Sequence, residues 1–482
     1  MDHWALVTLG ASIVMVLGPV VWILLRGELQ RFFPYVVAAS SFFLLNLVGS
    51  ASPAVSRLAV GVGFHLMFAS TAATLLLSYL VVKHRATRSE RPALPVRLEE
   101  SLRGTGRGCR RFLAAGVVCS ILAMAAFWVW VTPPFFVRRP VTASREKVLQ
   151  EIPSPEAPAQ QVPAELKSKR LVSGPVFGPV GSLIDARIAV VASRPFHWFA
   201  LAAFEIPLFI VALAATAIPI ARLVGARESF NWKATFAAVL ALALPASLWI
   251  LSKQYLLYIL AAVTLVALVH KGRIDWKIFT AFAASALVAL GTLYAIYLRG
   301  TPTGYARALA RTLWHRIVEV SPLGTAVAYK LFPDVIPFLG GRSLINPFRL
   351  LPYQQVSTAN LVYPYVYGQG GGSIPLPAVV ECYVNWGWWG VLAANIVVFI
   401  LVAGVTRLCW TRDLWLFAVS CYLTMKLLLL WQMPLWFGTL EPTLVLLVGI
   451  LVTCGLVLRN RHSSIGEKRE GGTQACPPGP VE

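Results

Sequence analysis

Residues 375–404 read PLPAVVECYVNWGWWGVLAANIVVFILVAG. Two prolines fix an extended approach to a helix, and from Trp388 onward the segment is almost continuously apolar. An apolar run of about 20 residues can cross the hydrocarbon core of a bilayer as one α-helix. The carboxylate Glu381 and the amide Asn385 lie just before this run. The segment therefore predicts a membrane span that begins beside polar chemistry.

The composition extends this interpretation to the whole chain. Of its 482 residues, 57% are hydrophobic and only 13% are charged, which is far too apolar for a soluble chain of this length. The sequence predicts an all-α polytopic membrane protein with about eleven transmembrane helices. The apolar runs that could span the membrane lie at 4–25, 32–50, 58–82, 112–131, 198–220, 234–251, 255–269, 278–298, 388–408, 414–431 and 443–458.

The positions of lysine and arginine predict the orientation. The net charge is +21, but the basic residues lie between apolar runs, so a nucleic-acid partner is not expected. If the N-terminus is outside, the strongly basic segment 83–111 and most other basic connections face the cytoplasm. The short outer loops then hold only Arg57 and Lys253. We therefore expect an outer N-terminus and a cytoplasmic C-terminus.

This topology divides the chain into six parts, of which two are long outer segments. A structureless segment of nearly ninety residues is improbable, so we expect the second outer segment to fold over the mouth of the helix bundle. The parts are 1–131 (four spans, with 83–111 as a basic cytoplasmic loop), 132–197 (first outer segment), 198–298 (four spans), 299–387 (second outer segment), 388–458 (three spans) and 459–482 (polar cytoplasmic tail).

A row of cations begins the second outer segment. The sequence YARALARTLWHRIVE, residues 305–319, predicts a short amphipathic helix. Arg307, Arg311 and His315 recur every four residues and share one face, which Arg316 flanks. Neighbouring cations repel one another unless an anion binds, and guanidinium groups offer phosphate a planar pair of donors. The pattern fits a diphosphate clamp and, equally, an interfacial helix whose arginines meet lipid headgroups.

Further candidates follow along the same segment. Lys330, Arg342 and Arg349 add cations, and Gly340–Gly341 would allow close approach of the backbone to a ligand. Glu381 lies in the first turns of its helix, where the helix dipole favours the ionised form. It could act as a base, bind a sugar hydroxyl, hold an arginine, or merely complement the dipole. No cysteine or histidine spacing resembles a metal site and no nucleotide-binding motif occurs, so neither a metal nor a cofactor is expected.

The stretch PLPAVVECYVNWGWWG resembles the start of a helix in bacterial oligosaccharide repeat-unit polymerases, the Wzy-type O-antigen polymerase family, through its Glu-x-Tyr-x-Asn-aromatic-Gly-x-x-Gly pattern. The upstream sequences RTLWHRIVEVSP and YKLFPDVIPFLGGRSL are similar to the large periplasmic loop of that family. The resemblance covers about 299–408 and the overall topology, whereas the N-terminal part is similar in hydropathy alone.

The resemblance implies a glycosyltransferase of the C-type fold class in the bacterial inner (cytoplasmic) membrane, with 299–387 as its periplasmic catalytic mouth. Such enzymes move a growing glycan from undecaprenyl diphosphate onto a new lipid-linked repeat unit, and so build O-antigen, capsule or exopolysaccharide. The implied partners are undecaprenyl-diphosphate-linked oligosaccharides and the lipid bilayer, with room for a chain-length regulator and a repeat-unit flippase.

The same resemblance and the charge pattern give a set of expected site residues. Glu381 and Arg311 are the predicted catalytic residues, with Glu319 and Asp334 as alternative proton acceptors. The predicted residues for the diphosphate and the sugars are Arg187, Arg307, His315, Arg316, Lys330, Arg342, Arg349, Tyr383 and Asn385.

Three other functions stay open. An O-antigen ligase shares the topology and the lipid substrate, but that family typically has a histidine shortly before the corresponding helix, and no histidine lies between 316 and 390. A polyprenyl-phosphate-sugar transferase usually has an acidic residue in its first outer loop, and ASPAVSR, residues 51–57, has none. A transporter or flippase of lipid-linked sugars should show repeated halves, and no internal repeat occurs.

Overall fold

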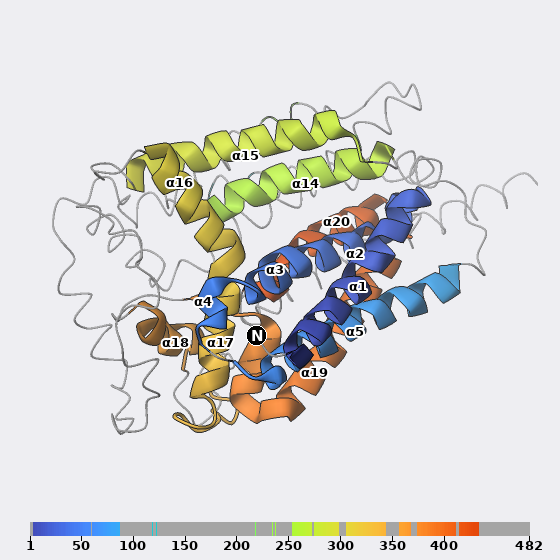
Figure 1. The fold of residues 1–482 in the computed structure, drawn as a ribbon. Helices are drawn as coiled ribbons and strands as arrows, with labels where there is room; N and C mark the ends of the chain where they lie inside the picture. Colours follow the sequence, from blue (N-terminus) through green and yellow to red (C-terminus); the bar gives the residue numbers. More distant parts are fainter. Residues whose placement is uncertain are drawn as a thin grey trace, which may run out of the picture.

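The computed structural model describes residues 3–58, 60–86, 253–271, 274–297, 305–343, 356–367, 374–410 and 414–432, and single positions at 118, 122, 217, 234 and 237. All regular structure in these ranges is helical (Figure 1). Four helices are long and apolar enough to cross a membrane: His3–Leu25, Leu29–Ser50, Val62–Ala86 and Ala378–Leu408. An all-helical, multi-pass membrane protein is thereby confirmed in this coarse form.

The four long helices form one bundle. Helix α1 (His3–Leu25) packs against α5 (Val62–Ala86), which packs in turn against α19 (Ala378–Leu408). Helix α2 (Leu29–Phe42) packs against α1, α19 and α20 (Leu414–Leu427). It continues through the π-helical segment η1 (Phe43–Leu47) into α3 (Val48–Ser50), and the short helix α4 (Pro53–Ser56) follows. The 3₁₀ segment η6 (Leu428–Trp431) extends α20.

Aromatic side chains fill the centre of this bundle. The ring of Phe42 lies 4.8 Å from that of Trp431 and 6.0 Å from that of Phe68, centroid to centroid. Phe33 meets Phe417 at 6.0 Å. Each ring removes a large apolar area from its surroundings, and edge-to-face geometry adds a favourable electrostatic contribution. The contacts with Trp431 and Phe417 join the N-terminal helices to residues more than 350 positions away in the sequence.

The outer surface of the bundle is also apolar. Val14, Leu77, Leu392 and Ile400 are 70, 53, 53 and 59% exposed. A soluble protein rarely exposes contiguous apolar surface of this kind, whereas a helix in lipid satisfies its own backbone and turns apolar side chains outward. The exposed rows therefore fit helices that face lipid.

The predicted spans at 4–25, 32–50, 58–82 and 388–408 correspond to the four long helices. Those at 255–269, 278–298 and 414–431 correspond to α14 (Lys253–Lys271), α15 (Trp276–Tyr297) and α20 with η6. Within the described residues, apolar stretches of these last two helices lie at Trp276–Val288 and Leu416–Trp431. The predicted spans at 112–131, 198–220, 234–251 and 443–458, and the segments 132–197 and 459–482, lie outside the described residues except for the single positions named above.

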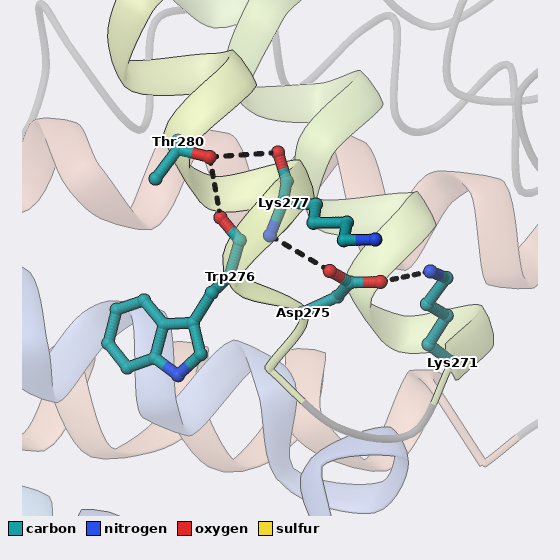
Figure 2. Close-up of polar contacts among 5 residues, drawn as sticks. All are labelled: Lys271, Asp275, Trp276, Lys277 and Thr280. Carbon is teal, nitrogen blue, oxygen red and sulfur yellow. Dashed lines mark hydrogen bonds and ion pairs between the residues drawn. The ribbon is translucent and has the colours of Figure 1, made fainter.

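A polar turn joins α14 to α15 (Figure 2). The Lys271 ammonium pairs with the carboxylate of Asp275, and the backbone N–H of Lys277 donates to Oδ1 of the same carboxylate at 2.9 Å. These hydrogen bonds, that of Lys271 first, lower the pKa of Asp275 because they favour its ionised form. The Thr280 hydroxyl donates to the Trp276 carbonyl at 2.8 Å and closes the first turn of α15. The charged and polar groups of this turn are suited to contact with water, as expected for a connection outside the bilayer.

A continuous helical segment runs from α16 (Tyr305–Trp314) through the π-helical segment η4 (His315–Glu319) into α17 (Val320–Leu331). Residues 320–328 are all buried, and α17 packs against α3, α4, α18 and α19. Gly49 makes this possible, because its bare Cα lies against the Val318 carbonyl. The predicted second outer segment thus does more than cover the mouth of the bundle, since it inserts a helix among the spans.

Helix α19 changes direction at Gly387, whose φ of 61° lies in the left-handed region that favours glycine. Residues 378–386 form a short arm that folds back on the rest of the helix, with Gly390 against the Cys382 carbonyl. Figure 1 shows the bend at the lower end of α19. Glu381 and Asn385 were expected just before the membrane span, but they lie on this arm and are each 1% exposed.

Three tryptophans surround the bend. Trp386, Trp388 and Trp389 are 41, 47 and 80% exposed. Tryptophan is enriched where a membrane protein crosses from hydrocarbon to headgroups, because its ring is apolar and its N–H is polar. The bend therefore fits the surface of the membrane.

The contact between Gly49 and Val318 gives the first prediction. Gly49→Ala would place a methyl group against the Val318 carbonyl and within 2.6 Å of Pro322 Cγ, so we expect a loss of about 1–3 kcal/mol or more in stability. The measurement is the fraction of detergent-purified protein that stays monodisperse after heating. Gly404→Ala is the matched control, since Gly404 has no neighbour within 4 Å of an added Cβ. Equal melting midpoints for the two variants would contradict this packing.

Candidate functional site

The described site residues form three groups. The first is a buried set around Asn385, called here the Asn385 clamp: Gly341, Ser343, Glu381 and Asn385. The second is the His315 triad, which consists of His315, Glu319 and Tyr367. The third is a set of exposed arginines on α16 and η4.

The Asn385 clamp ties the 339–343 turn to the arm of α19. The Asn385 carbonyl oxygen Oδ1 accepts from the backbone N–H of Gly341 at 2.9 Å and of Ser343 at 3.4 Å. Its amide Nδ2 donates to Ser343 Oγ at 2.6 Å and to the Glu381 carbonyl at 2.8 Å. Both the oxygen and the NH₂ group of one buried amide are therefore hydrogen-bonded. Because these groups lie away from water, losing any of the bonds would cost free energy of folding.

Two glycines shape the turn that the clamp holds. Gly340 and Gly341 have φ values of 57° and 94°, which other residues rarely adopt. The backbone N–H groups of Leu339 and Gly340 donate to the Val384 and Asn385 carbonyls at 3.0 and 3.1 Å. The glycines were predicted to admit a ligand, but in the structure they wrap the turn around the Asn385 side chain.

The clamp also encloses Glu381. Ser343 Oγ donates to Glu381 Oε1 at 3.1 Å, and the carboxylate is 1% exposed. A proton acceptor must come within about 2.6–3.2 Å of the hydroxyl that it serves. As placed, Glu381 organises the 339–343 turn and does not reach solvent.

Tyr383, between these two residues, faces α17 instead. Its hydroxyl donates to the Phe332 carbonyl at 3.1 Å, and its ring stacks on Tyr329 at 5.3 Å. Phe338 meets the same ring edge-on at 5.8 Å and lies over Gly387. Tyr383 therefore serves the packing between α17 and the arm.

The His315 triad joins η4 to helix α18 (Thr358–Tyr367). His315 is 8% exposed; its Nδ1 lies 3.1 Å from Glu319 Oε2, and its Nε2 lies 3.2 Å from the Tyr367 hydroxyl. The second carboxylate oxygen of Glu319 accepts from the Trp314 indole N–H at 3.2 Å. Both nitrogens of a buried imidazole and both oxygens of its carboxylate are thus engaged.

The surroundings of His315 keep it neutral. Burial is the largest effect and lowers the pKa of His315 below its ordinary value, because a charged imidazole would lose its hydration. The hydrogen bond to Glu319 raises the pKa, whereas Arg316 and Arg311 lower it. Burial also raises the pKa of Tyr367, so that hydroxyl keeps its proton at neutral pH.

The predicted row of cations divides at the π-helical segment. Arg307, Arg311 and Arg316 are exposed, whereas His315 is turned into the bundle. Arg307 and Arg316 have no carboxylate within 4 Å among the residues that the structure describes. They lie on the exposed surface of the helical segment that carries His315 and Glu319, where each could bind an anion.

The remaining candidates are more scattered. Lys330 is half-buried near the end of α17, Arg342 is exposed on the 339–343 turn, and Asp334 is exposed beside α17. Arg187 and Arg349 lie outside the described residues.

Sequence reasoning missed Ser343 and Tyr367, which complete the clamp and the triad. Tyr367 is 52 positions from His315 in the sequence, and no local pattern links them. Within the described ranges, no group of three His, Cys, Asp or Glu side chains is arranged to hold a metal ion.

The clamp gives a second prediction. Asn385→Ala removes four hydrogen bonds and leaves the N–H groups of Gly341 and Ser343 buried without their acceptor, so we expect a loss of about 2–4 kcal/mol. The measurement is thermal stability in detergent. Asn360→Ala is the matched control, because Asn360 is exposed on α18 and only its backbone is hydrogen-bonded. If both variants had the melting temperature of the wild type, the clamp would make no contribution to stability.

Comparison of the chain with family models, with curated proteins and with solved structures gives no match. The chemistry of the site is therefore argued from its own residues. What the described structure establishes is a helical bundle with four helices long and apolar enough to cross a membrane.

Proposed function

We propose that this chain is a membrane glycosyltransferase that polymerises undecaprenyl-diphosphate-linked oligosaccharide repeat units at the periplasmic face of the bacterial inner membrane. The observation that carries the proposal is the set of exposed arginines 307, 311 and 316 on the helical segment that also carries His315 and Glu319 of the triad, in a bundle with an apolar outer surface. The resemblance of 299–408 to the Wzy-type polymerases supports the same function.

The arginines suit the leaving group of such a reaction. When the anomeric C–O bond breaks, negative charge builds on the diphosphate, and cations fixed in advance stabilise that charge where water is scarce. Arginine stays charged at every physiological pH and binds phosphate oxygens in pairs. Exposed arginines at the headgroup level can meet a diphosphate whose polyprenyl chain stays in the bilayer.

The apolar surface of the bundle suits the other part of the substrate. Exposed side chains such as Leu392 and Ile396 on α19 lie beyond the Trp388–Trp389 pair along the same helix. A polyprenyl chain that follows this surface would bring its diphosphate to the bend, where the arm packs against the end of α17. One side of the site would thus bind lipid and the other sugar.

The proposed orientation has a direct test. Arg307→Cys should react with a membrane-impermeant maleimide in intact cells, whereas Arg85→Cys, exposed at the far end of α5, should react only after lysis. The parent would carry serine at Cys109, Cys119, Cys454 and Cys476, while Cys382, Cys409 and Cys421 are buried and can stay. The opposite labelling pattern would overturn the periplasmic location of the site.

Activity is tested with purified protein and an undecaprenyl-diphosphate oligosaccharide that the host pathway accepts. Wild-type protein should give a ladder of repeat multiples. Arg307→Gln and Arg316→Gln should each lower kcat/KM about 10–100-fold, because a charge-assisted hydrogen bond contributes about 1.5–3 kcal/mol. Arg407→Gln, exposed at the opposite end of α19, is the matched control and should leave the rate unchanged.

The products also separate the alternatives. A wild-type reaction that stays at one repeat would refute polymerisation. Transfer of one glycan to a different acceptor would then indicate a ligase, and movement of the lipid-linked sugar across a vesicle membrane without any new bond would indicate a flippase.

A further inference from the structure

The His315 triad has the geometry of a proton relay. A carboxylate can only accept hydrogen bonds, so the tautomer of His315 that satisfies its contact with Glu319 has the N–H on Nδ1. The other nitrogen, Nε2, then offers its lone pair to the Tyr367 hydroxyl at 3.2 Å. The bonds therefore run in one direction: Tyr367 donates to His315, and His315 donates to Glu319.

Local structure holds the members of this chain in place. His315 and Glu319 begin and end the π-helical segment η4, which packs against a second π-helical segment, η1. Isolated π-turns widen a helix locally and occur often at functional sites. The Trp314 indole N–H donates to Oε1 of Glu319, the carboxylate oxygen that does not contact His315. The His315 and Tyr367 rings meet edge-on at 6.2 Å between centroids.

Tyr367 stands at the open end of the relay. It is half-buried and is the last residue of α18, whereas His315 lies behind it in the interior. The charge of Arg316 acts on both groups: it lowers the pKa of His315, and it opposes the larger effect of burial, which raises the pKa of Tyr367. The phenol therefore lies between the buried imidazole and the exposed cations.

We propose that Tyr367 and His315, and not Glu381, accept the proton of the attacking sugar hydroxyl, with Glu319 as the positioning residue. This inference rests on the proposed function. The acceptor oxygen forms a bond to the anomeric carbon, and the bond from that carbon to the diphosphate oxygen breaks with its electron pair on the diphosphate. The acceptor proton passes to the Tyr367 oxygen as the Tyr367 proton passes to His315 Nε2, and the imidazolium later loses a proton to water.

The charges around the relay decide its pH dependence. Among the described residues, the ionisable groups that face it are Arg311 on α16, Arg316 and Glu319 on η4, and Tyr367 with its neighbour Tyr363 on α18, and η1 brings none. Since the pKa of His315 is lowered, the imidazole is neutral and able to accept a proton at pH 7. Activity should fall as the pH drops through that lowered value, below the ordinary 6.5, because the protonated ring has no lone pair to offer.

The test uses full-length protein in detergent and the undecaprenyl-diphosphate oligosaccharide, and it measures kcat against pH. His315→Gln should lower kcat about 10²–10⁴-fold and remove the acidic limb of the profile. Glu319→Gln keeps an acceptor for Nδ1 but removes the charge, so the acidic limb should move to lower pH. Tyr367→Phe should lower kcat with KM unchanged, and Tyr363→Phe, whose ring lies tilted against that of Tyr367 with 4.6 Å between centroids, is the matched control.

Each result decides the proposal. If the wild type polymerises and His315→Gln keeps both its rate and its acidic limb, the relay is wrong while the function stands. If the variants lose activity only in proportion to lost monodisperse protein, and the remaining enzyme has the wild-type profile, the triad is structural and the relay is again wrong. If the wild type makes no polymer, the proposed function fails and the relay fails with it.

Discussion

The arm of α19 and the 339–343 turn depend on one buried amide. Asn385 uses its carbonyl oxygen for the 339–343 turn and its NH₂ group for Ser343 and the Glu381 carbonyl. Without these bonds, the backbone N–H groups of Gly341 and Ser343 would be buried without the acceptor that Asn385 gives them. The left-handed turn at Gly387 supplies the change of direction, but the amide explains why the folded-back arm is held there.

The clamp is in turn joined to the spans through α17. Tyr383 reaches the Phe332 carbonyl at the end of α17, and Ser321 near its start lies within hydrogen-bond distance of Asn46 Oδ1 and the Trp431 carbonyl, at 3.2 and 3.1 Å. His315 and Glu319 on η4 therefore lie immediately before a helix that is held at both of its ends. Groups held by packed helices keep their geometry better than groups on a free loop, and proton transfer needs such geometry.

Sequence patterns predicted the described spans well, because a run of apolar residues has one stable placement in a bilayer. The helix at 305–314 and the turn chemistry of Gly340–Gly341 also followed from local rules. The buried position of His315 did not follow from local rules. A four-residue spacing puts it on the arginine face, and only tertiary contact with η1 and α18 turns it inward. Ser343 and Tyr367 were missed for the same reason, since their partners are distant in sequence.

The tryptophans at the bend of α19 have a consequence for where chemistry can occur. If Trp386, Trp388 and Trp389 keep the bend at the boundary between headgroups and hydrocarbon, the height of the whole polar end above the bilayer midplane is set by the length of helix below it. The diphosphate of a polyprenyl lipid has its own fixed height in the same membrane. Bilayer thickness would then govern how well the two heights match, and the protein would work best in membranes of one thickness.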